Sequence, residues 1–269
     1  MKISSRQVAL AAVFAALYFV LSLISPYIPA IGLPELKIKL EALIASIFGL
    51  ILGPYLGALA AFLGAFIAWV LPPGSMSPYG APFLFSPPIN ALVVGFIFYR
   101  RWKRAFALFG LLILAFLFSP PSQPIMGYGQ VFDPFNPSNH FDIPIYYVPI
   151  AVLWDKVITL FLIIPSVKFA GRLSTSKNIS ILFFLLMFIG NQADNMWGCN
   201  AFALPIVYES IFSIPLEGVR FLFIVSPFIY PAIRIVQAVL ATIIAVPLVR
   251  TLKNTEWIIA EKSIIENTK

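Results

Sequence analysis

Charged residues are scarce in this chain of 269 residues. Lys, Arg, Asp and Glu make up 11% of it, hydrophobic residues make up 60%, and the mean hydropathy is +0.94. A water-soluble domain of this length needs far more polar surface, so that class of protein is excluded. Several apolar spans of about 20 residues would occupy most of the chain. We therefore predict an all-α, multi-pass protein of the cell membrane, in which residues 1–269 form a single transmembrane domain.

Cysteine and histidine are nearly absent. The one cysteine, Cys199, excludes an intrachain disulfide and a thiolate metal cluster, and the one histidine, His140, excludes the two-histidine zinc motifs. We expect neither a metal nor a cofactor. The phosphate-binding motif G-x-x-x-x-G-K-[ST] does not occur either, so transport driven by ATP would need another polypeptide to bind the nucleotide.

Basic residues are concentrated in four short segments. Residues 2–6, 100–104, 168–177 and 250–269 hold 13 of the 18 Lys and Arg residues, and an even number of apolar stretches separates each segment from the next. The positive-inside rule then predicts eight spans with both termini cytoplasmic. The spans are expected at residues 8–28, 40–52, 55–71, 83–99, 105–118, 145–167, 179–197 and 218–249. Because the basic residues lie at span ends, topology and anionic membrane lipid explain the net charge of +7, and we expect no nucleic acid.

Four other segments carry structural signals. Residues 35–41 are amphipathic and are expected to extend the second span. Residues 119–144 contain six prolines and are too polar to cross a membrane, so we predict an ordered outer loop or lid. Residues 201–214 are apolar but interrupted, which favours a re-entrant or interfacial piece over a span. Residues 251–269 are expected to form a cytoplasmic tail.

Ionisable side chains inside the predicted spans are the strongest sign of function. Each costs about 2.5–3.5 kcal/mol near the centre of a bilayer, so it must be paired, hydrated or used. Asp194 and Arg234 lie at the same predicted height, and Asp155 lies somewhat deeper. Asp155 and Lys156 are adjacent and point about 100° apart on a helix, so their adjacency does not establish that they pair with each other.

Polar residues are densest at residues 190–200. Amides offer paired donors and acceptors, a carboxylate lies among them, and Trp197 offers a flat face, so we predict a pocket for a flat heteroaromatic ligand. The predicted substrate-binding residues are Asn90, Trp154, Asp155, Asn191, Gln192, Asp194, Asn195, Trp197, Tyr230 and Arg234. An alternative stays open, in which the charges only neutralise one another between helices and the tryptophans are interface anchors.

Small residues form rows at helical spacing. Ala11 and Ala15, and likewise Ala12 and Ala16, lie one turn apart in the first span, and similar rows at 57–65 and 60–68 run along the third. Such rows let helices approach closely in a membrane. They predict either packing within this chain or contact with a partner subunit.

Several segments resemble one known family. Residues 6–17, then 39–43 leading into 52–59, and the ending Pro247-Leu248-Val249-Arg250 of the last span resemble the substrate-binding (S) subunits of energy-coupling factor (ECF) transporters. The resemblance covers about residues 6–71 and 219–250. It implies a six-helix core, to which this chain would add extra helices.

The resemblance also implies a function. The chain would capture a vitamin or similar small-molecule micronutrient from outside, with the loop at residues 30–39 as a gate. Ala11, Ala12, Ala15 and Ala16 match the family's docking face for a transmembrane coupling subunit, and cytoplasmic ATPases would drive release inward. Membrane lipid is the other expected partner.

Two alternatives remain open. A stand-alone, proton-coupled secondary transporter would use Asp155 and Asp194 as proton-linked carboxylates. An intramembrane enzyme would need a base and a nucleophile within reach of each other, and the available candidates are Asp133, His140 and Asp142 in the outer loop.

Overall fold

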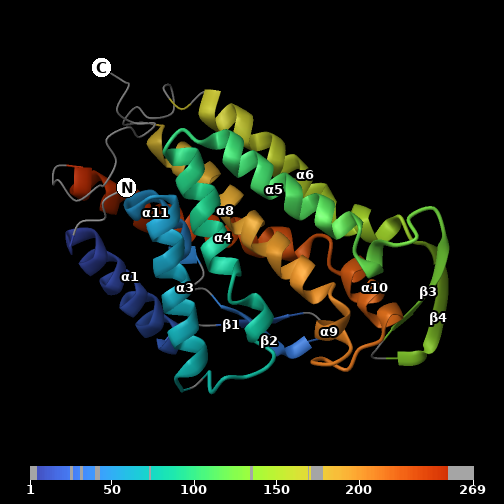
Figure 1. The fold of residues 1–269 in the computed structure, drawn as a ribbon. Helices are drawn as coiled ribbons and strands as arrows, with labels where there is room; N and C mark the ends of the chain where they lie inside the picture. Colours follow the sequence, from blue (N-terminus) through green and yellow to red (C-terminus); the bar gives the residue numbers. More distant parts are fainter. Residues whose placement is uncertain are drawn as a thin grey trace.

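The computed structural model describes residues 5–24, 27–30, 33–39, 43–72, 74–133, 136–168, 170 and 178–253, and these form a bundle of helices with two small hairpins (Figure 1). The helices are α1 (Ser5–Ile24), α2 (Ile44–Leu52), α3 (Pro54–Val70), α4 (Ser86–Phe98), α5 (Trp102–Leu117), α6 (Tyr147–Lys168), α8 (Ile179–Phe202), α9 (Pro205–Tyr208), α10 (Leu216–Val225) and α11 (Ile229–Lys253). Most of the predicted cytoplasmic tail, residues 254–269, lies outside the described residues.

Five helical segments of the described chain are long and apolar enough to cross a membrane. They are Gln7–Ile24, Ala81–Phe98, Tyr147–Lys168, Ile179–Phe202 and Ile229–Leu252. The predicted spans at 40–52, 55–71 and 105–118 correspond to shorter apolar helices, because α2 has 9 residues, α3 has 17 and α5 has 16. The helical multi-pass class therefore holds, whereas the count of eight full-length spans stays a prediction.

The predicted span at 218–249 is two helices, which corrects the sequence interpretation. Helix α10 ends at Val225, and α11 begins at Ile229. Pro227 lies in the break and cannot donate a backbone hydrogen bond to continue α10. The Ser226 hydroxyl donates a hydrogen bond of 2.9 Å to the Leu222 carbonyl, which satisfies an acceptor at the end of α10. We call residues 226–228 the elbow.

Two hairpins correct the expectation of an all-α chain in detail. Strand β1 (Tyr27–Ala30) pairs antiparallel with β2 (Leu33–Lys39), and β3 (Tyr128–Asp133) pairs antiparallel with β4 (Asn136–Pro144). Residues 35–39 therefore form a strand and do not extend the second span. Their polar and apolar residues alternate with a period of two, which is the strand pattern. The ordered outer segment predicted at 119–144 contains the β3–β4 hairpin.

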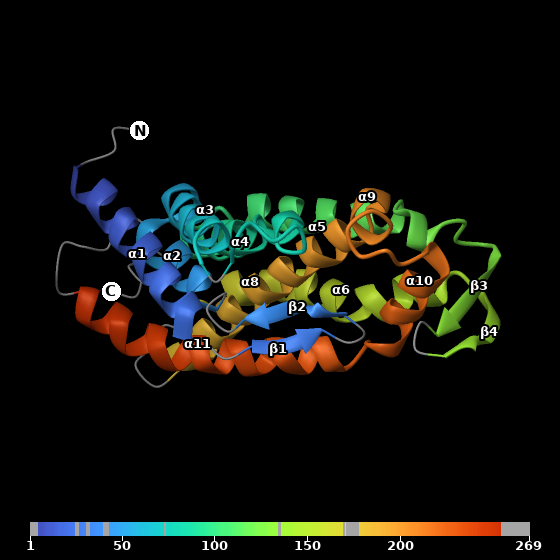
Figure 2. The same ribbon diagram turned by 90° about the horizontal axis from the view of Figure 1, so that it is seen from below.

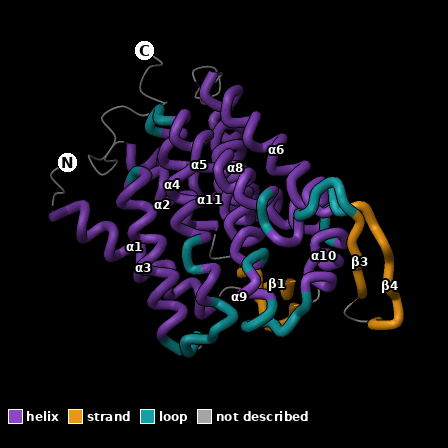
Figure 3. The backbone as a smooth tube through the Cα atoms, turned by 45° about the vertical axis from the view of Figure 1, so that its right-hand side comes forward, coloured by secondary structure: helices purple, strands orange, loops and turns teal. Residues whose placement is uncertain are grey.

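The hairpins lie away from the helix ends that carry the basic segments. The start of α1 and the end of α11 lie close together at the left of Figure 1, and the β3–β4 hairpin lies at the far right. Figure 2 shows β1 and β2 facing the viewer from below, and Figure 3 shows both hairpins at the lower and right sides of the bundle. This separation fits the predicted topology, and which side is cytoplasmic stays a prediction.

Glycines allow the first helices to pack closely. A methyl group on Gly57 would lie 2.6 Å from the Phe48 carbonyl oxygen, and one on Gly64 would lie 2.6 Å from Tyr18 Cβ. Ala60 and Ala61 of α3 are completely buried. The small-residue rows of α3 therefore pack within this chain, against α1 and α2, which is one of the two uses that the sequence allowed.

Helix α8 is the centre of the bundle. It packs against α4, α5, α6 and α11, and residues 189–196 are buried without interruption. A helix that is buried on all sides usually carries apolar residues around its whole circumference. Residues 190–195 of α8 instead carry four buried polar side chains, Asn191, Gln192, Asp194 and Asn195, which makes this segment the candidate site.

Two helical glycines give a matched test of the packing. A methyl group on Gly95 would lie 2.6 Å from Pro54 Cα, whereas nothing lies within 4 Å of one on Gly110. We expect Gly95→Ala to lower the free energy of unfolding by about 1–3 kcal/mol through overpacking. Gly110→Ala should leave it unchanged or raise it by up to about 1 kcal/mol through helix propensity. Thermal unfolding of the purified protein in detergent measures both, and equal shifts would contradict the packing.

Candidate functional site

One side of α8 is joined to α4 and α2 by a chain of side-chain hydrogen bonds. The Asn90 amide donates to Asn191 Oδ1 at 3.0 Å, and the Ser46 hydroxyl donates to Asn90 Oδ1 at 2.6 Å. All three side chains are fully buried. Gly190 makes the approach possible, because a methyl group there would collide with Asn90 Oδ1.

The next side of α8 faces α11 through a pair of opposite charges. Arg234 Nη1 lies 3.6 Å from Asp194 Oδ2, and it also donates a hydrogen bond of 2.8 Å to Gln237 Oε1. The Ser86 hydroxyl of α4 donates to the Asp194 backbone carbonyl at 3.4 Å. The sequence placed Asp194 and Arg234 at the same height, and the structure places them side by side.

Several polar atoms of this cluster are buried without a hydrogen-bond partner. They are Asn191 Nδ2, Gln192 Nε2, Gln192 Oε1, Asp194 Oδ2 and Arg234 Nε. An unsatisfied buried polar group costs about 1–3 kcal/mol, so such groups are rare in native proteins and need an explanation. These unpaired donors and acceptors belong to amide, carboxylate and guanidinium groups. We call Asn90, Asn191, Gln192, Asp194 and Arg234 the amide cluster.

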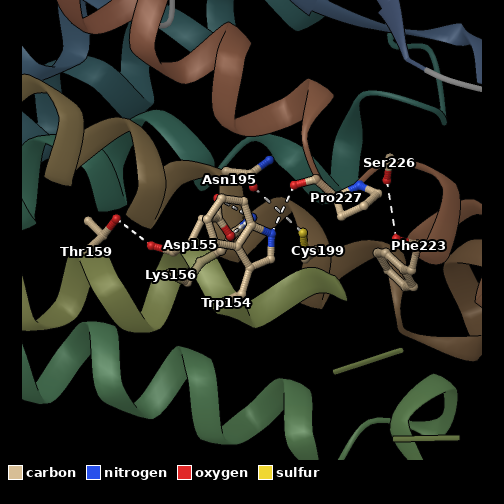
Figure 4. A network of polar contacts seen from close by, with 9 residues as sticks. All are labelled: Trp154, Asp155, Lys156, Thr159, Asn195, Cys199, Phe223, Ser226 and Pro227. Atoms are coloured by element: carbon tan, nitrogen blue, oxygen red, sulfur yellow. Dashed lines mark hydrogen bonds and ion pairs between the residues drawn. The ribbon is translucent and has the colours of Figure 1, made fainter. Parts of the chain in front are cut away.

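A second polar group lies where α8 meets α6 (Figure 4). Lys156 Nζ lies 2.9 Å from Asp155 Oδ1 and 3.0 Å from Asp155 Oδ2, and both side chains are buried. The pairing of these two neighbours, which the sequence left open, is thus present in the structure. The flexible four-carbon stem of lysine spans the 100° between them, and an unpaired charge would be too costly at this depth.

Asn195 and Cys199 of α8 face this second pair. Cys199 Sγ lies 4.0 Å from Asn195 Oδ1, and the thiol interacts electrostatically with Lys156, Asp155 and Arg234. The two charged pairs therefore flank the same turn of α8. The Thr159 hydroxyl donates to the Asp155 carbonyl at 2.7 Å, so it engages backbone and not the carboxylate.

The predicted aromatic residues surround the polar groups and do not join the amide cluster. Trp154 donates its indole N–H to the Pro227 carbonyl at 3.0 Å, and Trp197 donates to the Pro82 carbonyl at 3.1 Å. The Trp197 ring meets Phe85 edge-on with centroids 5.7 Å apart. Tyr230 is half-buried near the start of α11. Both tryptophans thus fix loop carbonyls beside the polar core.

Several site residues were missed by reasoning from the sequence. Ser46, Ser86 and Gln237 are buried partners of the amide cluster, and Lys156 is the partner of Asp155. Gln237 could have been found, because it follows Arg234 by three residues and therefore shares its helix face. The two serines gave no signal, since small hydroxyls are common in membrane helices.

The predicted partner face of α1 is divided. Ala11 and Ala15 are buried inside the bundle, and the Ala15 carbonyl lies where a methyl group on Gly64 would approach to 3.0 Å. Ala12 and Ala16 are exposed. Of these four alanines, only Ala12 and Ala16 are therefore open to contact from outside the chain.

The candidate residues for an enzyme lie on the β3–β4 hairpin. His140 and Asp142 are exposed on β4, opposite Phe132 and Gln130 in the strand register. Asp133 ends β3 and faces Asn136. The hairpin holds them apart from the amide cluster and from the Asp155–Lys156 pair.

One comparison with known proteins finds a family match over the first part of the chain. Residues 2–118 match the family model described as ECF-type riboflavin transporter, S component. This confirms the resemblance to S components. The match covers α1 to α5, so α8 and α11 with most of the amide cluster lie beyond it. No curated protein and no solved structure matches the chain significantly.

The matched family is one of substrate-binding membrane subunits of ECF importers. Together with the long apolar helices, the match indicates a multi-pass protein of the cell membrane. The family is not an enzyme family, which sets aside the intramembrane enzyme. It implies two kinds of partner, the substrate and the subunits of the ECF module.

The Asp194–Arg234 pair can be tested by a double-mutant cycle. Asp194→Asn leaves the Arg234 charge buried without its counterion, so the free energy of unfolding should fall by about 3–5 kcal/mol. Adding Arg234→Gln should recover part of this loss, with a coupling energy of about 0.5–3 kcal/mol. Denaturant or thermal unfolding in detergent measures the cycle. Purely additive effects would show that the two side chains do not interact.

Proposed function

We propose that this chain captures riboflavin, or a micronutrient with a similar flat heteroaromatic ring, from the outer side of the membrane. The matching family, that of ECF-type riboflavin transporter S components, supports riboflavin as the first candidate. The observation that carries the proposal is the amide cluster, in which five buried polar atoms have no hydrogen-bond partner. A flavin ring has carbonyl and N–H groups along one edge, which complement amide donors and acceptors.

Each member of the cluster would have a distinct role. Gln192 has both polar atoms free and would form a donor–acceptor pair with the ring edge. Asn191 would donate through Nδ2, while its Oδ1 is held by Asn90. Arg234 and Asp194 would bind polar groups at the other end of the ligand. Asp194 Oδ2 and Arg234 Nε have no hydrogen-bond partner, so each could bond a ligand group beside the ion pair.

The other predicted residues would shape access to the site. Asp155, Asn195, Trp154 and Tyr230 lie on the α6 side and at the start of α11. Trp197 would close the site from the segment before α4. The β1–β2 hairpin lies where the gate at residues 30–39 was expected, and its movement would admit the ligand.

The docking surface for the ECF module would be the exposed side of α1. Ala12 and Ala16 provide small residues for close approach, and Val8, Val13 and Val20 beside them are also exposed. This chain has no phosphate-binding motif, so cytoplasmic ATPases on other polypeptides would supply the energy.

A proton-coupled transporter remains the second candidate. It would use Asp155 and Asp194, but each carboxylate lies within 4 Å of a basic group. Two neutralised pairs fit a binding subunit better than a proton pathway. Uptake by this chain alone, stopped by a protonophore but not by ATP depletion, would favour the alternative.

Ligand binding can be tested with a pair of glutamine variants. Gln192→Met removes both unpaired atoms at similar volume, so the Kd for riboflavin should rise about 10- to 100-fold, the equivalent of about 1–3 kcal/mol. Gln130→Met on the exposed face of β3 should leave the Kd unchanged. Fluorescence titration in detergent measures both. Equal affinities for the two variants would remove the amide cluster from the proposal.

The charged pair should be required for binding as well. We expect Asp194→Ala or Arg234→Ala to abolish ligand binding while membrane insertion continues. Insertion is measured by membrane fractionation, and binding by the same titration. A folded variant with wild-type affinity would place the ligand elsewhere.

Docking can be tested on α1 without touching the ligand site. Ala12→Trp combined with Ala16→Trp should abolish co-purification of partner subunits by steric block, with the riboflavin Kd unchanged. Leu111→Trp, on an exposed face of α5, is the matched control and should preserve co-purification. Partner recovery after detergent extraction from the native membrane is the measurement, and unchanged recovery in the double variant would exclude this face.

A further inference from the structure

An apolar groove lies between α6 and the elbow, apart from the amide cluster. Its volume is about 370 Å³, within the usual range of small-molecule sites. The α6 wall consists of Tyr147, Ile150, Ala151 and Trp154, which share one helix face. Ile224 of α10, Pro227 and Phe228 form the opposite wall, and Ile143 of β4 closes one end.

Specific contacts hold the walls of this groove in place. The Trp154 indole N–H donates a hydrogen bond to the Pro227 carbonyl across it (Figure 4). The Trp154 ring also packs on Phe228, with ring centroids 5.7 Å apart. On α10, the buried Arg220 donates hydrogen bonds to the Pro121 and Gln123 carbonyls at 3.3 and 2.7 Å. Because these bonds tie α10 to the segment before β3, the end of the groove at Ile143 is fixed too.

The chemistry of the lining selects a hydrocarbon. None of the eight lining residues carries a charge. The Trp154 N–H is already bonded to Pro227, and the Tyr147 ring packs against Tyr146 with ring centroids 4.7 Å apart. A polar ligand would lose its hydration in this groove without gaining partners, whereas an alkyl chain loses nothing.

The position of the groove points to the source of that hydrocarbon. Helices α6 and α11 are both candidate membrane spans, and Ile150 and Phe228 at the groove are 58% and 73% exposed. A chain lying there runs along a membrane helix, as the hydrocarbon tails of the bilayer do.

We propose that this groove is a binding site for one hydrocarbon chain of a membrane lipid. The lipid chain fills the wedge between α6 and the elbow and packs against Trp154 and Phe228. When the lipid chain is removed, Trp154 and Phe228 lose the packing that it provided, and the elbow becomes looser. Arg234 lies on α11, six residues after Phe228 of the elbow. The bound lipid therefore supports the helix that carries the Arg234 guanidinium group of the amide cluster.

The test compares two substitutions on one face of α6. Ala151→Phe fills the groove, whereas Ile158→Phe adds a ring two turns away, outside the groove lining. The full chain is incorporated into nanodiscs of phosphatidylcholine and then extracted in mild detergent. The extracted protein is examined by native mass spectrometry. We expect one retained lipid per chain for the wild type and for Ile158→Phe, and its loss for Ala151→Phe.

Further readouts keep the outcome decisive. Circular dichroism verifies folding, and the smaller Ala151→Leu replaces Ala151→Phe if the larger side chain prevents it. Adding phosphatidylcholine to delipidated protein should raise the Tm of the wild type and not that of the groove variant. Equal lipid retention by both variants overturns the proposal. So does a dimer that Ala151→Phe dissociates, because the groove would then hold a second copy of the chain.

Discussion

A polar side chain within a bilayer has no water to bond with, and this constraint shapes the whole interior of the protein. Each such group must find a partner inside the protein or serve a ligand. Around α8, Asn90 has a partner inside the protein in Asn191, and Asp155 has one in Lys156. Gln192 has neither polar atom bonded within the described structure. Asn191 Nδ2 and Asp194 Oδ2 of the same helix also lack a hydrogen-bond partner, and a binding site is the best explanation of these unpaired groups.

Close packing of the first helices brings this chemistry together. Gly57 and Gly64 let α3 approach α2 and α1, and Gly190 lets α8 approach Asn90 of α4. Without these glycines the helices would stand farther apart, and the hydrogen bonds of about 3 Å between α2, α4 and α8 could not form. The region that matches the S-component family thus provides one wall of the site. The later helices α8 and α11, outside the match, provide the charged wall.

The far end of the bundle combines rigid and adjustable parts. Arg220 ties α10 to the segment before the β3–β4 hairpin, and Trp154 ties α6 to the elbow. Between these fixed contacts lies the apolar groove, which opens along membrane helices. The β1–β2 hairpin lies nearer the middle of the molecule, away from the β3–β4 hairpin (Figure 2).

The sequence alone determined the class of protein and the level of its site. Hydropathy and basic residues at span ends predict a multi-pass helical protein, and residue spacing places Asp194 level with Arg234, because rise per residue is constant along a helix. The direction in which each side chain points was decided only by tertiary structure. Rotation of a helix about its axis depends on all its neighbours, so burial of Ala11 but not Ala12 could not be read from their spacing. The elbow and the Asp155–Lys156 pair were missed for the same reason: a local pattern does not show which partners the fold supplies.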